Sequence, residues 1–97
     1  MENNKVSGKN MPEKKFSAGG ISATVWNNES TFDGKVTQYK TVTVDRKYKD
    51  KEGNWKTTSS MRVNDLPKLA LVSQKAYEYL VFKIDGQEAP SVEEIVV

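Results

Sequence analysis

Aromatic, hydroxyl and basic side chains are interleaved between residues 22 and 62 of this chain. Aromatic rings stack on unpaired bases, hydroxyls bond phosphates or base edges, and Lys or Arg neutralises a phosphodiester backbone. Residues 35–62 hold eight basic residues against three acidic ones, so the local charge is positive. This pattern favours a surface for single-stranded nucleic acid, single-stranded DNA first. The candidate binding residues are Trp26, Tyr39, Thr43, Arg46, Lys47, Tyr48, Lys49, Lys56, Thr58 and Arg62.

Other chemistries find little support in the residue types. The chain has no Cys and no His, which excludes disulfides, thiolate or imidazole zinc sites, a thiol nucleophile and an imidazole base. Ser59 or Ser60 near Lys56 forms no Ser-Lys site, because no oxyanion loop or orienting third group accompanies the pair. Three nearby carboxylates, Asp45, Asp50 and Glu52, do not match a calcium loop. We therefore expect no enzyme, no metal and no cofactor.

Charge divides the 97-residue chain unevenly. All 15 basic residues lie in residues 1–83, whereas residues 84–97 carry only acidic charge. We expect a flexible basic arm over residues 1–14, a binding domain over 15–85 and a flexible acidic tail over 86–97. Solvated surface charge is the plain alternative. A second functional alternative is a protein-protein interaction module that acts through a helix face and the acidic tail.

Two further absences bear on location. No run of 18 apolar residues is present, and the N-terminus lacks the apolar segment of a secretory signal. We expect a cytoplasmic protein that does not enter a membrane.

Three segments show the period of strands that have one buried face. Apolar and polar residues alternate over residues 16–26, 36–48 and 54–63. Gly19-Gly20 predicts a bend, residues 27–34 form a turn-rich stretch, and Asp50–Gly53 predicts a hairpin loop with Gly in the left-handed conformation. The expected result is an antiparallel sheet of about four strands.

The alternation also assigns faces to this sheet. Val42, Val44 and the Ile21/Ala23/Val25 set define an inner face, and Met61 with Val63 extends it to the third strand. Trp55 shares the parity of Met61, so packing is expected for it rather than base stacking. Arg46 and Tyr48 share parity with Val44, so either their strand outlasts the core or the two residues are partly buried. The first is favoured, because Arg is rarely buried unpaired.

One helix is expected after the strands. Asn64 or Asp65 can cap it, Pro67 is tolerated in its first turn, and Lys83 with Gly86 marks its end. Its predicted inner face is Leu66, Leu69, Ala70, Ser73, Ala76, Tyr77 and Leu80. A core this small, without disulfide or zinc, favours a homodimer. The candidate dimer-interface residues on the helix are Leu71, Tyr79 and Phe82.

Several segments together carry a resemblance. They are Phe16–Asn27, Val44–Asp50, Gly53–Thr58 and Asp65-Leu66-Pro67. These residues resemble a group of small, uncharacterised archaeal proteins over residues 16 to about 83. More distantly, the order of antiparallel strands followed by one helix is similar to the positive-cofactor-four (PC4-like) and Whirly-like group. That resemblance implies an α+β fold, pairing through the helices, and single-stranded DNA binding across a curved sheet.

Overall fold

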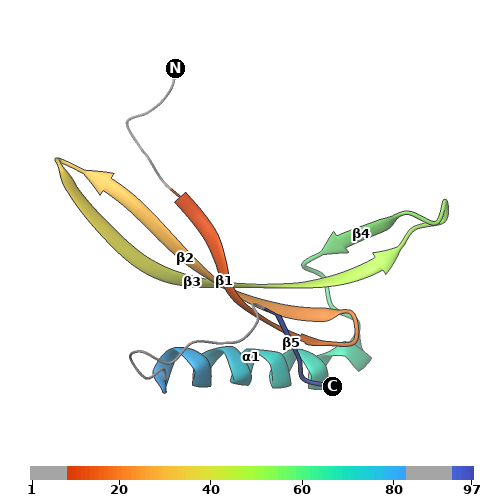
Figure 1. Cartoon of the computed structure of the whole chain (residues 1–97). Helices are drawn as coiled ribbons and strands as arrows, with labels where there is room; N and C mark the ends of the chain where they lie inside the picture. Colours follow the sequence, from red (N-terminus) through yellow and green to blue (C-terminus); the bar gives the residue numbers. More distant parts are fainter. Residues whose placement is uncertain (1–8, 83–92) are drawn as a thin grey trace.

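The computed structural model describes residues 9–82 and 93–97 of the chain (Figure 1). A single turn of 3₁₀ helix, η1, precedes the one α-helix. The elements in chain order are β1 (Lys9–Ala18), β2 (Ile21–Phe32), β3 (Lys35–Lys49), β4 (Trp55–Thr58), η1 (Val63–Asp65), α1 (Leu66–Val81) and β5 (Glu93–Ile95).

Five strands form one mixed sheet in the order β4-β3-β2-β1-β5. The first four are joined as consecutive antiparallel hairpins, whereas β5 lies parallel to β1. Figure 1 shows α1 across one face of the sheet, with the β2–β3 and β3–β4 hairpin ends extending beyond it in opposite directions. The α+β class with one helix is thus confirmed. The purely antiparallel four-strand sheet is wrong, because the short acidic segment that forms β5 shows no strand period in the sequence.

The two ends of the chain contribute strands where flexible segments are expected. Lys9–Lys14, part of the expected arm, forms the start of β1, and Glu93–Ile95, part of the expected tail, forms β5. The remaining arm residues 1–8 and the tail residues 86–92, with the expected stop at Gly86, lie outside the described residues. The single strand expected over residues 16–26 is two strands, because Gly19, at φ 64°, turns the chain between β1 and β2.

The long β2–β3 hairpin replaces the turn-rich stretch. Only Asp33 and Gly34 form the turn, at φ 56° and 78°, as a two-residue type I′ connection requires. Strand pairing runs without a break from Ile21 opposite Arg46 to Phe32 opposite Lys35. The Asn, Ser and Thr residues of 27–31 therefore belong to β2, where Asn28 is buried and the others are half-buried. Their polar composition gives no apolar period that would identify a strand.

The next hairpin is shorter than the sequence indicates. Gly53 adopts φ 85°, which confirms the left-handed glycine in the loop after β3. However, β4 ends at Thr58, and the chain from Ser59 to Arg62 is not a strand. The strand alternation predicted over residues 54–63, which includes Met61 and Val63, therefore ends at Thr58.

The helix forms where expected but in a different rotation. It begins after Asp65 and ends at Val81, with Pro67 in its first turn. Val72 and Ala76 are buried, whereas Leu66, Ala70, Ser73 and Tyr77 of the predicted inner face are exposed. Leu69, Ala76 and Leu80 do face the core. The core consists of Phe16, Ala18, Ile21, Ala23, Val25, Val72 and Ala76, with Val44, Met61, Leu69, Tyr79, Leu80 and Val96 packed around it.

No helix within residues 9–82 or 93–97 is long and apolar enough to cross a membrane.

Candidate nucleic-acid interface

The face of the sheet opposite α1, here called the outer face, carries part of the predicted set. Strand register fixes this assignment, because directly paired residues share a face. Ala23 pairs with Val44 on the core side, so Thr43 beside Thr24 and Tyr39 beside Asn28 lie on the outer face. The predicted residues that the structure brings together on the outer face are Trp26, Tyr39, Thr43, Lys47 and Lys49.

Trp55 also lies on the outer face, and sequence reasoning assigned it to the wrong side. It pairs with Lys49, just as Thr57 pairs with Lys47. Its side chain is 66% exposed, and Lys49 Nζ lies 5.3 Å from the ring centroid. The expectation that Trp55 packs inside is therefore wrong. The length of the loop from Asp50 to Asn54 could have predicted the correct face, because it determines that Lys49 of β3 lies opposite Trp55 of β4.

An open hollow adjoins this tryptophan. Lys47, Trp55, Lys56 and Thr57 line it, and its volume is about 380 Å³. Lys47 and Lys49 form no ion pair with the described residues. An aromatic ring with two uncompensated ammonium groups on one face can stack a base and neutralise the adjoining phosphates.

The middle of the outer face is built from small polar side chains. Ser17, Ser22 and Thr24 are buried, and the two serine hydroxyl oxygens lie 3.2 Å apart. Small side chains there leave the larger groups on either side to project. Glu93 on β5 adds an acidic group at this end, where its carboxylate accepts a hydrogen bond of 3.0 Å from Ser17. Positive charge on the outer face is therefore concentrated toward β4.

Hydrogen bonds between side chains hold the aromatic residues of the β2–β3 hairpin. Trp26 Nε1 donates to Thr43 Oγ1 at 2.9 Å, which leaves the half-buried indole in one orientation. Asn28 Nδ2 donates to Thr41 Oγ1 at 2.9 Å and to the carbonyl of Tyr39 at 3.4 Å. The polar residues Asn28, Thr41 and Thr43, whose types are typical of loops, thus form the hydrogen bonds that order this part of the outer face.

Five predicted site residues do not belong to the outer face, although Lys56 also lines the hollow beside Trp55. Strand pairing of Arg46 with Thr58 and of Tyr48 with Lys56 places these four on the helix side of the sheet, and Arg62 lies in the connection before η1. Lys56 Nζ is 3.7 Å from the Asp50 carboxylate. Arg46 stacks on Tyr48, with its guanidinium carbon 5.6 Å from the ring centroid. Trp55 was expected inside, which would have placed Lys56 and Thr58 on the opposite face. The β3–β4 register reverses this alternation, so Trp55 is on the outer face and Lys56 and Thr58 are not.

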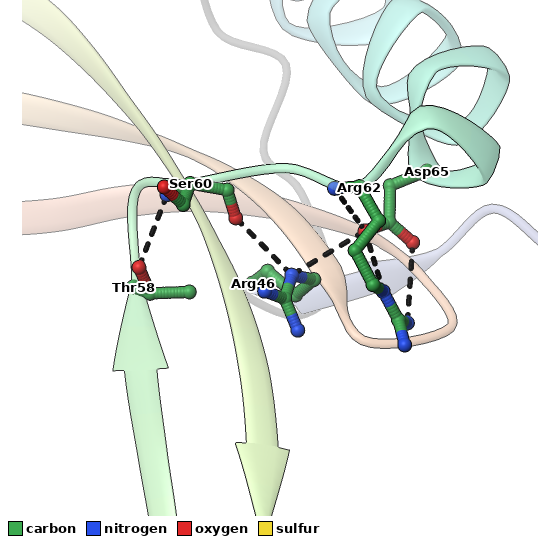
Figure 2. Close-up of polar contacts among 5 residues, drawn as sticks. All are labelled: Arg46, Thr58, Ser60, Arg62 and Asp65. Carbon is green, nitrogen blue, oxygen red and sulfur yellow. Dashed lines mark hydrogen bonds and ion pairs between the residues drawn. The ribbon is translucent and has the colours of Figure 1, made fainter.

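Arg46 and Arg62 converge on one carboxylate (Figure 2). Asp65 Oδ2 accepts from the backbone N–H of Arg62 at 2.9 Å and from its Nε at 3.2 Å, and Arg46 Nε lies 3.3 Å away. Arg46 also donates to the carbonyl of Ser60 at 3.1 Å. The Arg62 backbone and side-chain hydrogen bonds, with the positive charge of Arg62 and Arg46, hold the pKa of Asp65 below its usual 3.8. These arginines join β3 to the start of α1.

The predicted dimer residues do not form one surface. Tyr79 packs edge-on against Phe16, with centroids 6.0 Å apart, and donates from its hydroxyl to Glu13 Oε2 at 2.6 Å. It therefore faces the core of its own chain. Leu71 is half-buried, and Phe82 is 71% exposed at the end of the helix.

The described residues contain no group of three or more acidic side chains placed to hold a metal ion. No family model matches the chain, and neither does any curated protein or solved structure.

Proposed function

We propose that this chain is a non-catalytic protein that binds single-stranded nucleic acid, DNA in preference, across the outer face. The observation that carries the proposal is the exposed Trp55 ring beside Lys47 and Lys49 on one face of the β3–β4 hairpin. A stacked base contributes about 1–3 kcal/mol, and the neighbouring ammonium groups suit the phosphates on either side of it.

The length of β3 suits more than one nucleotide. Tyr39 and Lys47 lie on the same face of this strand, roughly 27 Å apart at about 3.4 Å per residue. Trp26 and Thr43 lie between these two ends. A strand that follows β3 would thus pass from the cationic hollow toward the aromatic residues of the β2–β3 hairpin.

Duplex recognition is a weaker interpretation of the same surface. A helix that reads the major groove presents a polar or basic face to DNA. The helix α1 packs on the sheet and contains only Lys68 and Lys75 as basic residues. The outer face instead offers aromatic side chains, which need unpaired bases to stack on.

The test is fluorescence anisotropy with labelled single-stranded and duplex oligonucleotides at several salt concentrations. With Lys47 and Lys49 neutralising two phosphates on the outer face, the slope of log affinity against log salt should be about −1.4. Lys47→Glu combined with Lys49→Glu should abolish binding and leave the thermal unfolding curve unchanged.

The matched control is Lys68→Glu combined with Lys75→Glu, which reverses two charges on α1, away from the outer face. This variant should bind as the wild type does. If the control and the outer-face double variant lost the same affinity, the loss would be explained by net charge and not by a site on the outer face. No binding of the wild type at low salt would overturn the proposal and favour the protein-interaction module.

A further inference from the structure

Strand β3 has a long edge with no strand beside it among the residues that the structure describes. One side of β3 pairs with β2 over Lys35–Arg46, but the other side pairs with β4 only over Arg46–Lys49. The segment from Lys35 to Asp45, here called the open edge, therefore presents backbone N–H and C=O groups that no described strand pairs. Residues 35–43 are all exposed, and Val36 reaches 58%. Such an edge is a template for another strand.

The open edge is complementary to itself. If two copies pair antiparallel with Lys40 opposite Lys40, every residue meets one of the same face, because the residue numbers of each pair sum to 80. The resulting pairs are Lys35 with Asp45, Val36 with Val44, Thr37 with Thr43, Gln38 with Val42, and Tyr39 with Thr41. Opposite charges, aliphatic pairs, threonine pairs and aromatic with β-branched pairs are the favourable combinations across strands.

The like charges at the axis are compensated within each copy. Lys40 Nζ forms an ion pair with Glu13 Oε1 on its own chain and lies 3.4 Å from Asn27 Oδ1. Each copy therefore brings a neutral pair to the axis rather than a bare ammonium group.

The length of the open edge also selects this register. Pairing starts at Lys35, just after the Asp33-Gly34 turn of one copy, and stops at Asp45 of the other copy. The next residue, Arg46, already pairs with Thr58 at the end of β4, so the entire open edge is used. A shift by two residues in either direction separates Lys35 from Asp45 and leaves part of the edge without a partner. A Cβ built on Gly34 would meet no heavy atom of the described residues within 4 Å, so the turn itself leaves space beside it.

We propose that a second copy of this chain pairs with the open edge, antiparallel and centred on Lys40. The two five-stranded sheets then join into one, with both helices on the same side. The outer faces also become continuous across the seam, where Tyr39, Thr41 and Thr43 of both copies meet. Dimerisation rests on the edge alone and is independent of the proposed nucleic-acid binding.

The absence of cysteine permits a direct test of the axis. Lys40→Cys should form an intermolecular disulfide under mild oxidation, because residues opposite one another in an antiparallel pair have Cα atoms about 4.5–5.5 Å apart. Gln38→Cys is the matched control on the same strand, outside the charged pair. The two Gln38 residues would lie on the order of 14 Å apart, so this variant should not cross-link.

Charge exchange tests the register in solution without oxidation. Sedimentation velocity should show a dimer for the wild type, and Lys35→Glu should raise the dimer dissociation constant about tenfold, since two pairs per dimer change from opposite to like charge. Adding Asp45→Lys to the same chain should restore wild-type association. A wild type that stays monomeric at high micromolar concentration overturns the proposal. Dimers that Phe82→Ser abolishes and that Lys35→Glu leaves unchanged also overturn it, in favour of the helix.

Discussion

At the scale of single residues, the two tryptophans of the outer face differ in what holds them. The Trp26 indole is half-buried and donates to Thr43, whereas Trp55 is largely exposed and contacts Lys49. We therefore expect Trp55→Ala to weaken single-strand binding by about 1–3 kcal/mol without lowering the melting temperature.

Single-tryptophan variants measure this separately. Trp26→Phe retains Trp55 and should keep the quenching of emission on binding, while Trp55→Phe should lose most of it. Quenching that follows Trp26 instead would place the bases over the β2–β3 hairpin and away from the hollow beside Lys47.

The lowered pKa of Asp65 predicts how the stability of the fold depends on pH. Because its pKa is lowered in the folded chain, the stability that it contributes is complete above about its usual 3.8 and is lost as pH falls through the lower folded value. Denaturant unfolding followed by circular dichroism should thus show a decline below pH 4. Asp65→Asn should be less stable at pH 7 and show a smaller decline in acid. An identical acid profile for the two proteins would assign the decline to other carboxylates.

At the scale of elements, the rotation of α1 is testable by paired truncations. Val72 is buried against the sheet, whereas Tyr77 is 60% exposed. Val72→Ala should cost about 2 kcal/mol in the free energy of unfolding, because it removes buried apolar volume. Tyr77→Ala should change it by less than about 0.5 kcal/mol. Both free energies are measured by urea unfolding. A larger loss for Tyr77→Ala than for Val72→Ala would support the inner helix face predicted from the sequence.

The elements also show which sequence signals were sufficient. The alternation around Val42 and Val44 predicted β3 and placed Tyr39, Thr43 and Lys47 correctly, because a half-buried strand has a strict period of two. The same reasoning failed for Trp55, since β4 ends at Thr58 and Met61 reaches the core from a connection that is not a strand. The helix has apolar residues on more than one side, so the sequence does not determine which side faces the sheet. Tertiary packing determines this rotation.

At the scale of the whole molecule, pairing between distant segments escaped prediction. β5 contains only Glu93–Ile95, and nothing in its composition indicates a parallel partner near the start of the chain. Its position depends on contacts that local periodicity does not encode: Val96 packs on the core, and its N–H donates to the Ser17 carbonyl at 2.7 Å. The acidic end of the chain is thus partly a structural element.

Removing residues 93–97 should therefore destabilise the fold. Loss of the half-buried Val96 and of the pairing with β1 should cost roughly 1–2 kcal/mol, which lowers the melting temperature by about 4–16 °C in a domain of this size. Differential scanning calorimetry of the truncated and full chains checks this. Equal melting temperatures of the two chains would show that residues 93–97 do not stabilise the fold, as expected for a flexible tail.

The turn of two residues between β2 and β3 has a consequence for the order of folding. A hairpin closed so locally forms in about 1–10 µs, whereas pairing Lys15 with Glu93 requires most of the chain to be brought together first. The β2–β3 ladder should form early and β5 should join last. Amide hydrogens should accordingly exchange most slowly in the central part of β2 and fastest in β5, so that the strand that completes the sheet is also where the native chain first opens.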